Sequence, residues 1–258
     1  MTLNKVVDSA AAAVADIPHG ASLAVGGFGL AGIPWILTEA LLHQGAADLT
    51  VVSNNCGVDG AGLGLLLSAK RISRVIASYV GNNKEFARQY LAGELTVELT
   101  PQGTLAERMR AGGSGIGAFY TPTGVGTLIS EGGLPWRYHP DGSIAVASPP
   151  KEVRTFAGTA MVLEESITTE YALIRAHVVD KAGNCQFHAA ANNFNPPAAM
   201  AGRITIVEAE HVLEVGELHP DAIHLPGIFV QRIVALTPEQ AAHKQIEQRT
   251  TRARPVTP

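Results

Sequence analysis

Cysteine is nearly absent from this chain of 258 residues, and aromatic residues are scarce at 5%. Cys56 and Cys185 are too few to form a disulfide framework or a cysteine-based zinc site. Charged residues make up only 16%, and the net charge of −4 argues against nucleic acid or an anionic membrane as a main partner. No apolar run reaches the roughly 18 residues of a membrane-spanning helix, and Asp8 interrupts the first apolar stretch. We therefore expect a cytoplasmic protein without a signal peptide.

Glycine, in contrast, is abundant at 27 residues, and 46% of the chain is hydrophobic. Such a composition is typical of α/β proteins, in which glycine serves the tight turns between strands and helices. Strand and helix signals alternate over the first 130 residues. This alternation predicts an open, mainly parallel sheet with helices on both faces. The expected strands are residues 22–25, 49–53, 75–78 and 97–99. The expected helices include residues 10–14, residues 63–69 and a helix that Pro34 begins and Gly45 ends. Two more helices are expected, one capped by Asn82 and one begun by a capping box at Thr104 and Glu107.

The remainder of the chain carries hairpin signals instead. Asp141-Gly142 and residues 181–184 are turn sequences between short β-rich pieces. We expect one mixed α/β domain over residues 1–249, with β-hairpins added to the parallel core. Residues 250–258 are basic, contain proline and lack apolar periodicity, which predicts a disordered tail. Further strands are expected at residues 171–179, 186–188, 204–208 and 228–235.

A glycine-rich segment follows the first expected strand. Gly27, Gly29 and Gly32 satisfy G-x-G-x-x-G just before a helix, the placement that suits a pyrophosphate at a helix N-terminus. A ribose-binding acid should then end the next strand, but Asn54 and Asn55 stand there. A nicotinamide site is therefore disfavoured. A tight turn without a ligand and a backbone-lined site for an anionic or acyl group both remain open, and the second is favoured.

The same segment carries a resemblance to a known family. Residues 19–34 (HGASLAVGGFGLAGIP) resemble the first signature of family I coenzyme A (CoA) transferases, in which GGFxxxGxP follows an apolar run. His19 departs from the usual Asp or Asn. The resemblance covers residues 5 to about 235 and is strongest to A subunits of succinyl-CoA:3-oxoacid (acetoacetate) CoA transferases. Further matching segments are 53–59 (SNNCGVD), 78–83 (SYVGNN), 99–108 (LTPQGTLAER), 118–127 (AFYTPTGVGT), 192–195 (NNFN) and 226–230 (PGIFV).

The resemblance implies a reaction that needs a second chain. In this family a glutamate of the B half, in a Ser-Glu-Asn-Gly motif, attacks the acyl-CoA and becomes a glutamyl–CoA thioester. This chain has only Ser130-Glu131-Gly132-Gly133, so Glu131 is interpreted as a helix-end residue and Glu164-Glu165 as the end of a strand. We therefore expect a B-type partner, succinyl-CoA and a 3-oxo acid as substrates, and no cofactor, because CoA is itself a substrate.

Six residues are the candidates for the site. Gln102 lies between a strand and a helix start, and it matches the family's oxyanion-hole glutamine. Asn54, Asn55 and Tyr79 end strands at the same edge and resemble the family's pocket residues, with Gly26 and Gly27 as a backbone wall near the thioester. A solvent-exposed loop residue is the alternative for Gln102. Turn formation is the alternative for the two asparagines.

Other charged and titratable residues give weaker signals. His211, His219 and His224 lack zinc-ligand spacing, so no metal site is expected. Arg108 and Arg110 follow Gln102 and belong either to a solvated helix face or to a contact between subunits. Alternative functions are a 3-oxoadipate CoA transferase, one half of a ring-opening acyl-CoA hydrolase, a sugar-phosphate isomerase and a dehydrogenase. The isomerase would need an in-chain carboxylate base near the edge of the sheet, and the dehydrogenase is disfavoured by the missing ribose acid.

Overall fold

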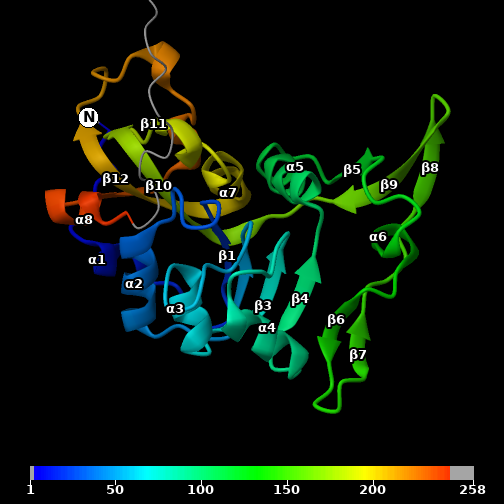
Figure 1. Cartoon of the computed structure of the whole chain (residues 1–258). Helices are drawn as coiled ribbons and strands as arrows, with labels where there is room; N and C mark the ends of the chain where they lie inside the picture. The colour runs from blue at the N-terminus through cyan, green and yellow to red at the C-terminus, as the bar shows by residue number, and fades with distance from the viewer. Residues whose placement is uncertain (1–2, 245–258) are drawn as a thin grey trace, which may run out of the picture.

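The computed structural model describes residues 3–244, and its centre is one long sheet (Figure 1). Neighbouring strands along the main path of the sheet are all parallel, and the short β11 (Cys185–Gln186) pairs antiparallel with β10. The open, mainly parallel sheet predicted from the sequence is confirmed. The order is β13 (Arg232–Ala235), β12 (Gly202–Leu213), β10 (Thr169–Asp180), β1 (Ser22–Val25), β2 (Leu49–Val52), β3 (Ile72–Ala77) and β4 (Thr96–Leu99).

Helices cover both faces of this sheet, as predicted. Successive strand residues alternate between the faces, so Leu23 and Val25 belong to one hydrophobic cluster and Ala24 to the other. The first cluster holds side chains of α1 (Ala10–Val14), α2 (Trp35–Gln44), α3 (Leu63–Ser68) and α4 (Lys84–Leu91). The second holds those of α5 (Gln102–Gly113) and α7 (Asn195–Ala201). Two buried faces explain the nearly continuous apolar strands of the sequence.

Two predicted helix starts are wrong, the first by one residue and the second by three. Asn83, not Asn82, caps α4, because its side chain accepts the amide of Phe86, while Asn82 has a φ of 63°. Helix α5 begins at Gln102 instead of after a capping box at Thr104. The carbonyl of Pro101 already accepts the amide of Leu105 at 2.8 Å, so the first turn forms without the box. Gln102 is therefore the first residue of a helix and not a loop residue.

A protruding arm, residues 114–165, departs from the layered body (Figure 1). The predicted hairpin at Asp141-Gly142 is confirmed, since it joins β6 to β7. Among residues 3–244, none of the three hydrophobic clusters contains a residue of the arm. Backbone pairing joins the strands of the arm to one another, and side-chain hydrogen bonds such as that of Arg137 to the carbonyl of Gly93 at 2.9 Å join the arm to the body. Its elements are β5 (Ala118–Thr121), α6 (Leu128–Glu131), β6 (Pro135–Tyr138), β7 (Ile144–Ala147), β8 (Val153–Phe156) and β9 (Thr159–Glu165).

The C-terminal part differs in detail from the predictions. The strand expected at residues 228–235 starts only at Arg232, because Gly227–Phe229 forms a 3-10 turn. The chain then reaches the short helix α8 (Pro238–Ala242). The predicted tail at residues 250–258 lies outside the described residues, and a single domain over residues 1–249 stays a prediction. No helix within residues 3–244 is long and apolar enough to cross a membrane.

Candidate functional site

Four of the six predicted site residues meet in one pocket. Asn54 and Asn55 follow β2, Tyr79 lies two residues after β3, and Gln102 begins α5 after β4. Parallel strands end at a common edge, so these chain segments converge at the carboxyl edge of the sheet. The pocket has a volume of about 310 Å³. Its remaining lining residues are Phe28, Gly29, Leu30, Val58, Ser78 and Asn82.

The two asparagines form the rigid floor of this pocket. Asn54 is 2% exposed, and its amide Nδ2 donates to the hydroxyl of Ser78 at 2.9 Å. The same hydroxyl donates to the carbonyl of Asn54 at 3.0 Å, which ties the end of β2 to the end of β3. Asn55 is 8% exposed. A buried polar side chain with hydrogen-bond partners is fixed in orientation, as Asn54 is here.

Gln102 and Tyr79 form the exposed rim. Tyr79 is 49% exposed, and Gln102 is exposed at the N-terminus of the twelve-residue helix α5. Pro101 gives this helix no side-chain cap. The first backbone N–H groups of a helix lack intrahelical partners and carry partial positive charge. Negative charge that develops beside Gln102 would therefore be stabilised by the backbone amides of the helix as well as by the side chain of Gln102. The sequence pattern places Gln102 before the helix and so does not predict the contribution of these amides.

The glycine loop, residues 26–34, contributes a wall at a different position from the one predicted. The lining residues of this pocket do not include Gly26 or Gly27. Gly26 borders a small neighbouring space that it shares with Asn55. Gly27, at a φ of 105°, closes the turn so tightly that an added Cβ would lie 2.4 Å from Ile33 Cγ2. The next three residues, Phe28, Gly29 and Leu30, form the wall. The apolar Phe28 inside a glycine-rich turn was the sequence signal that could have indicated this wall.

Glu208 occupies the helix N-terminus to which a dinucleotide would bind. This residue is fully buried, and its carboxylate accepts the backbone amide of Leu37 in the first turn of α2 at 2.9 Å. Burial raises the pKa of Glu208 to about 7, although Arg175 and the helix amides oppose that rise. A pyrophosphate would have to displace this side chain from the same amides. The structure therefore speaks against the nicotinamide interpretation for a reason that lies far away in the sequence.

The carboxylates that were considered as nucleophiles lie elsewhere. Glu131 ends α6 on the arm, as predicted. The pair Glu164-Glu165 ends β9, as predicted, and Glu164 is 1% exposed and accepts a hydrogen bond from Lys151 at 2.7 Å. The ten residues that line the pocket, all within the described part of the chain, include no carboxylate, cysteine, lysine or histidine. This pocket offers amide and hydroxyl groups but no strong nucleophile.

Arg108 is neither part of a solvated face nor free for a contact between subunits. It is 9% exposed, and it binds Glu98 at 2.7 Å and the carbonyl of Glu165 at 2.7 Å. Burial works to raise the pKa of Glu98, but Arg108 and Arg74 outweigh it and hold that pKa below its ordinary value. Arg108 thus connects the body with the base of the arm. Arg110 is exposed and pairs with Glu107.

One cluster of histidine and glutamate side chains could not be recognised from the spacing of histidines in the sequence. The pairing of β10 with β12 brings side-chain atoms of His177, Glu210 and His211 within 4.8 Å of one another. The expectation that no ligand set exists, based on spacing alone, therefore overlooked this cluster. The carboxylate of Glu210 already binds Arg175 at 3.0 Å and Lys244 at 2.7 Å, besides His177 at 2.9 Å. Two fixed cations at the same carboxylate oppose a metal ion, so we interpret the group as an ion-pair network.

Comparisons with known proteins agree with this geometry. Residues 7–236 match the family model described as "Coenzyme A transferase". A Mycobacterium tuberculosis chain, named as the A subunit of a probable succinyl-CoA:3-ketoacid coenzyme A transferase, is 61% identical over 97% of this chain and 100% of its own length. Human mitochondrial "Succinyl-CoA:3-ketoacid coenzyme A transferase 2" is 52% identical over 92% of this chain but only 45% of its own length.

Solved structures extend the agreement to the fold. Glutaconate coenzyme A-transferase from Acidaminococcus fermentans superposes with a TM-score of 0.74 at 22% identity, over 93% of this chain and 78% of that one. An acyl-CoA transferase from Escherichia coli O157:H7 gives 0.75 at 22% identity, over 93% of this chain and 48% of that one. At these identities the likeness concerns the fold alone.

Proposed function

The chain belongs to the coenzyme A transferase family, and from this premise we propose that it is the A half of a succinyl-CoA:3-oxoacid CoA transferase. It would move CoA between succinyl-CoA and a 3-oxo acid such as acetoacetate. The names of relatives at 61% and 51% identity, each matched over more than nine tenths of its length, support the 3-oxoacid class. Those names favour this function over 3-oxoadipate transfer and over ring-opening hydrolysis. CoA acts as a substrate, and no cofactor is proposed.

The observation that carries the proposal is a polar pocket without a nucleophile. Acyl transfer through a covalent thioester needs a carboxylate, and the pocket at the carboxyl edge of the sheet supplies none. A B-type chain with the Ser-Glu-Asn-Gly motif would bring the glutamate to the pocket, in an AB pair or a doubled A₂B₂ heterotetramer. The human relative, which this chain covers over 45% of its length, has room for a second half in one chain.

Each candidate residue then has a chemical role. Tetrahedral intermediates of acyl transfer place negative charge on an oxygen, which preorganised donors stabilise. The neutral side-chain amide of Gln102 donates a hydrogen bond to that oxygen, beside the N-terminus of α5, which has no side-chain cap. Asn54, Asn55 and Tyr79 provide donors for the carboxylate or the 3-oxo group of the acid. Gly26 and Gly27 shape the loop whose next residues form the wall.

The partner requirement is tested by reconstitution. The purified chain alone should not exchange CoA between succinyl-CoA and acetoacetate, and activity should appear when a B-type chain is added. Replacing acetoacetate with 3-oxoadipate in the same assay tests the 3-oxoadipate alternative, and incubation with a cyclic acyl-CoA without an acceptor acid tests ring-opening hydrolysis. Robust turnover by the chain alone would contradict the proposal and direct attention back to Glu131 and Glu164.

A further inference from the structure

The NNFN segment of the sequence contacts the glycine loop from across the fold. Asn193 Nδ2 donates to the carbonyl of Ala31 at 3.1 Å, although 162 positions separate the two residues. Two residues later, Asn195 Nδ2 donates to the carbonyl of Gly32 at 2.9 Å. Between them, the Phe194 ring lies 6.5 Å from the Phe28 ring, measured between centroids. Three successive residues, 193–195, thus contact the loop, and we call them the clamp.

Asn195 anchors the clamp to the sheet. It is fully buried, its Oδ1 accepts the backbone amide of Arg175 on β10 at 3.1 Å, and its Nδ2 also donates to the carbonyl of Ala191 at 2.9 Å. The side chain lies directly over Gly26, where an added Cβ would be 2.0 Å from Asn195 Oδ1. A buried amide with both ends bonded has one allowed orientation. The first glycine of the loop is thus required by the clamp.

The clamp holds the loop on both sides of the residues that face the pocket. Asn195 contacts Gly26 before them and Gly32 after them. Inside this frame, Phe28 and Ala31 exchange two backbone hydrogen bonds of 3.0 Å, which close a tight turn. The turn is therefore closed on itself, and the clamp contacts the chain on both sides of it. Phe28, Gly29 and Leu30 on this turn line the pocket beside the asparagines of β2.

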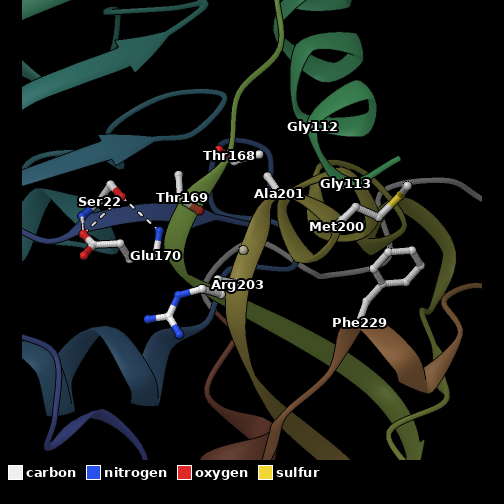
Figure 2. Close-up of a pocket in the computed structure, with 11 residues that line it drawn as sticks. Ser22, Gly112, Gly113, Thr168, Thr169, Glu170, Met200, Ala201, Arg203 and Phe229 are labelled. Atoms are coloured by element: carbon white, nitrogen blue, oxygen red, sulfur yellow. Dashed lines mark hydrogen bonds between the residues drawn. The ribbon is translucent and has the colours of Figure 1, made fainter. Parts of the chain in front are cut away.

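Figure 2 shows the neighbouring surface around the other end of α7, where Met200 and Ala201 lie beside Gly112 and Gly113 of α5. An added Cβ at Gly112 would lie 2.0 Å from the carbonyl oxygen of Ile167, and one at Gly113 would lie 2.4 Å from Met200 Cβ. Helix α7 is therefore packed closely at its C-terminal end. The clamp, which includes the first residue of this helix, stands on a fixed support.

We propose that Asn195 and Asn193 are positioning residues that hold the glycine-loop wall of the pocket in place for the acyl substrate. Neither residue lines the pocket, so both act through the loop. If the wall is already ordered before the substrate binds, no binding free energy is lost in ordering it. The affinity for the substrate is then higher, while the reacting groups stay the same. The substrate effect rests on the proposed function, whereas the effect on the loop is a property of this chain alone.

The first test measures the loop without a partner or a substrate. Asn193→Ala removes the donor to Ala31 and Ala190. Asn195→Asp keeps the size and Oδ1 but removes the donor to Gly32 and Ala191. Hydrogen exchange by mass spectrometry should be about tenfold faster over residues 26–34 in both variants, the scale set by one lost hydrogen bond. Exchange in α4 should not change. The exposed neighbour Asn192 supplies the matched control, Asn192→Ala.

A second measurement uses Trp35, which packs with Leu30 and Ile33 at the end of the loop. The chain contains two tryptophans, so in a Trp136→Phe background all tryptophan fluorescence comes from Trp35. Acrylamide should quench it more strongly in the clamp variants than in Asn192→Ala. Equal exchange and equal quenching in the clamp variants and in the control would overturn the proposal. Asn193→Ala keeps the test decisive even if Asn195→Asp folds poorly, because Asn193 is only half-buried.

Kinetics of the assembled enzyme then test the consequence for the substrate. The KM for the acyl-CoA should rise about three- to tenfold, the range of one hydrogen bond, while kcat stays within about twofold. A merely structural role would lower the active fraction, and so kcat, without raising KM. Faster loop exchange with unchanged KM would overturn the positioning role. If the assembled parent enzyme transferred no CoA, the proposed function would fail, while the exchange data would still decide whether the clamp exists.

Discussion

The carboxyl edge of the parallel sheet and the arm of residues 114–165 are stabilised in different ways. The edge rests on strands that are buried on both faces, Asn54 is hydrogen-bonded to Ser78, and the neighbouring Asn55 is buried. The arm consists of short antiparallel strands with several exposed apolar side chains, such as Ile144 at 51% and Val153 at 45%. The contrast shows where rigidity is concentrated in this fold. The polar groups proposed for chemistry stand on the part that core packing fixes.

The largest expected effect is a loss of activity from a substitution at the carboxyl edge of the sheet, compared with a substitution on the arm. Gln102→Ala in the assembled enzyme should lower kcat by about 10²–10³, because one oxyanion donor is lost. Gln102→Glu should be as slow or slower, since a carboxylate repels the developing charge. Ile144→Ala on the arm should stay within about twofold of the parent, and gel filtration checks assembly of all three. A Gln102→Ala enzyme within about twofold of the parent would make the assignment wrong, and Asn54 would be the next candidate.

The second prediction compares the same regions by stability. Leu173, on β10, is fully buried, so Leu173→Ala should lower the free energy of unfolding by about 2–5 kcal/mol. Val153→Ala on the arm should change it by no more than about 0.5 kcal/mol. Urea unfolding followed by circular dichroism measures both. Equal losses would show that the arm is packed as tightly as the body, and the contrast between the two regions would then be wrong.

The junction between the two regions gives the third prediction. Arg108→Met keeps the length of the side chain but removes the bonds to Glu98 and to the carbonyl of Glu165. The expected loss is about 3 kcal/mol, because Glu98 stays buried with only Arg74 as a partner. The depressed pKa of Glu98 contributes stability above its unfolded pKa of about 4.3, and this contribution disappears as the pH falls through the folded value. Urea midpoints from pH 7 to pH 3 should therefore fall less steeply in the variant, and an unchanged slope would count against the pairing.

The smallest effect concerns Glu208, under the glycine loop. Its pKa of about 7 lies above the unfolded value, so the folded chain keeps a proton that the unfolded chain releases between about pH 4.3 and 7. Stability from this group is therefore complete below that window and is lost as the pH rises through it. Glu208→Gln should flatten this decline by about 1–3 kcal/mol between pH 4.5 and pH 8. Parallel pH profiles of parent and variant would contradict the raised pKa.

Local sequence signals predicted much of the body, because its strands and helices alternate with clear caps and turns. The first strand was predicted with its observed bounds, and strand ends located Asn54, Asn55 and Tyr79 at one edge. What escaped prediction depends on contacts between distant segments. Glu208 caps α2 from 171 positions away, and Asn195 meets Gly32 from 163 positions away. No local pattern reports such contacts, since the pairing of β10 with β1 creates them.

The arm was the least predictable region for a different physical reason. Its short strands expose residues on both faces, so the usual alternation of apolar and polar residues is weak. Only the turn chemistry of Asp141-Gly142 indicated structure there. The start of α5 was misplaced because Thr104 and Glu107 imitate a capping box inside the helix.

The central claim is that this chain shapes the pocket while its partner provides the nucleophile. The most direct test incubates the assembled enzyme with succinyl-CoA, without an acceptor acid, and measures the intact mass of each chain. We predict a covalent CoA adduct on the B-type chain and none on this chain. An adduct on this chain, traced by peptide mapping to Glu131 or Glu164, would contradict the claim.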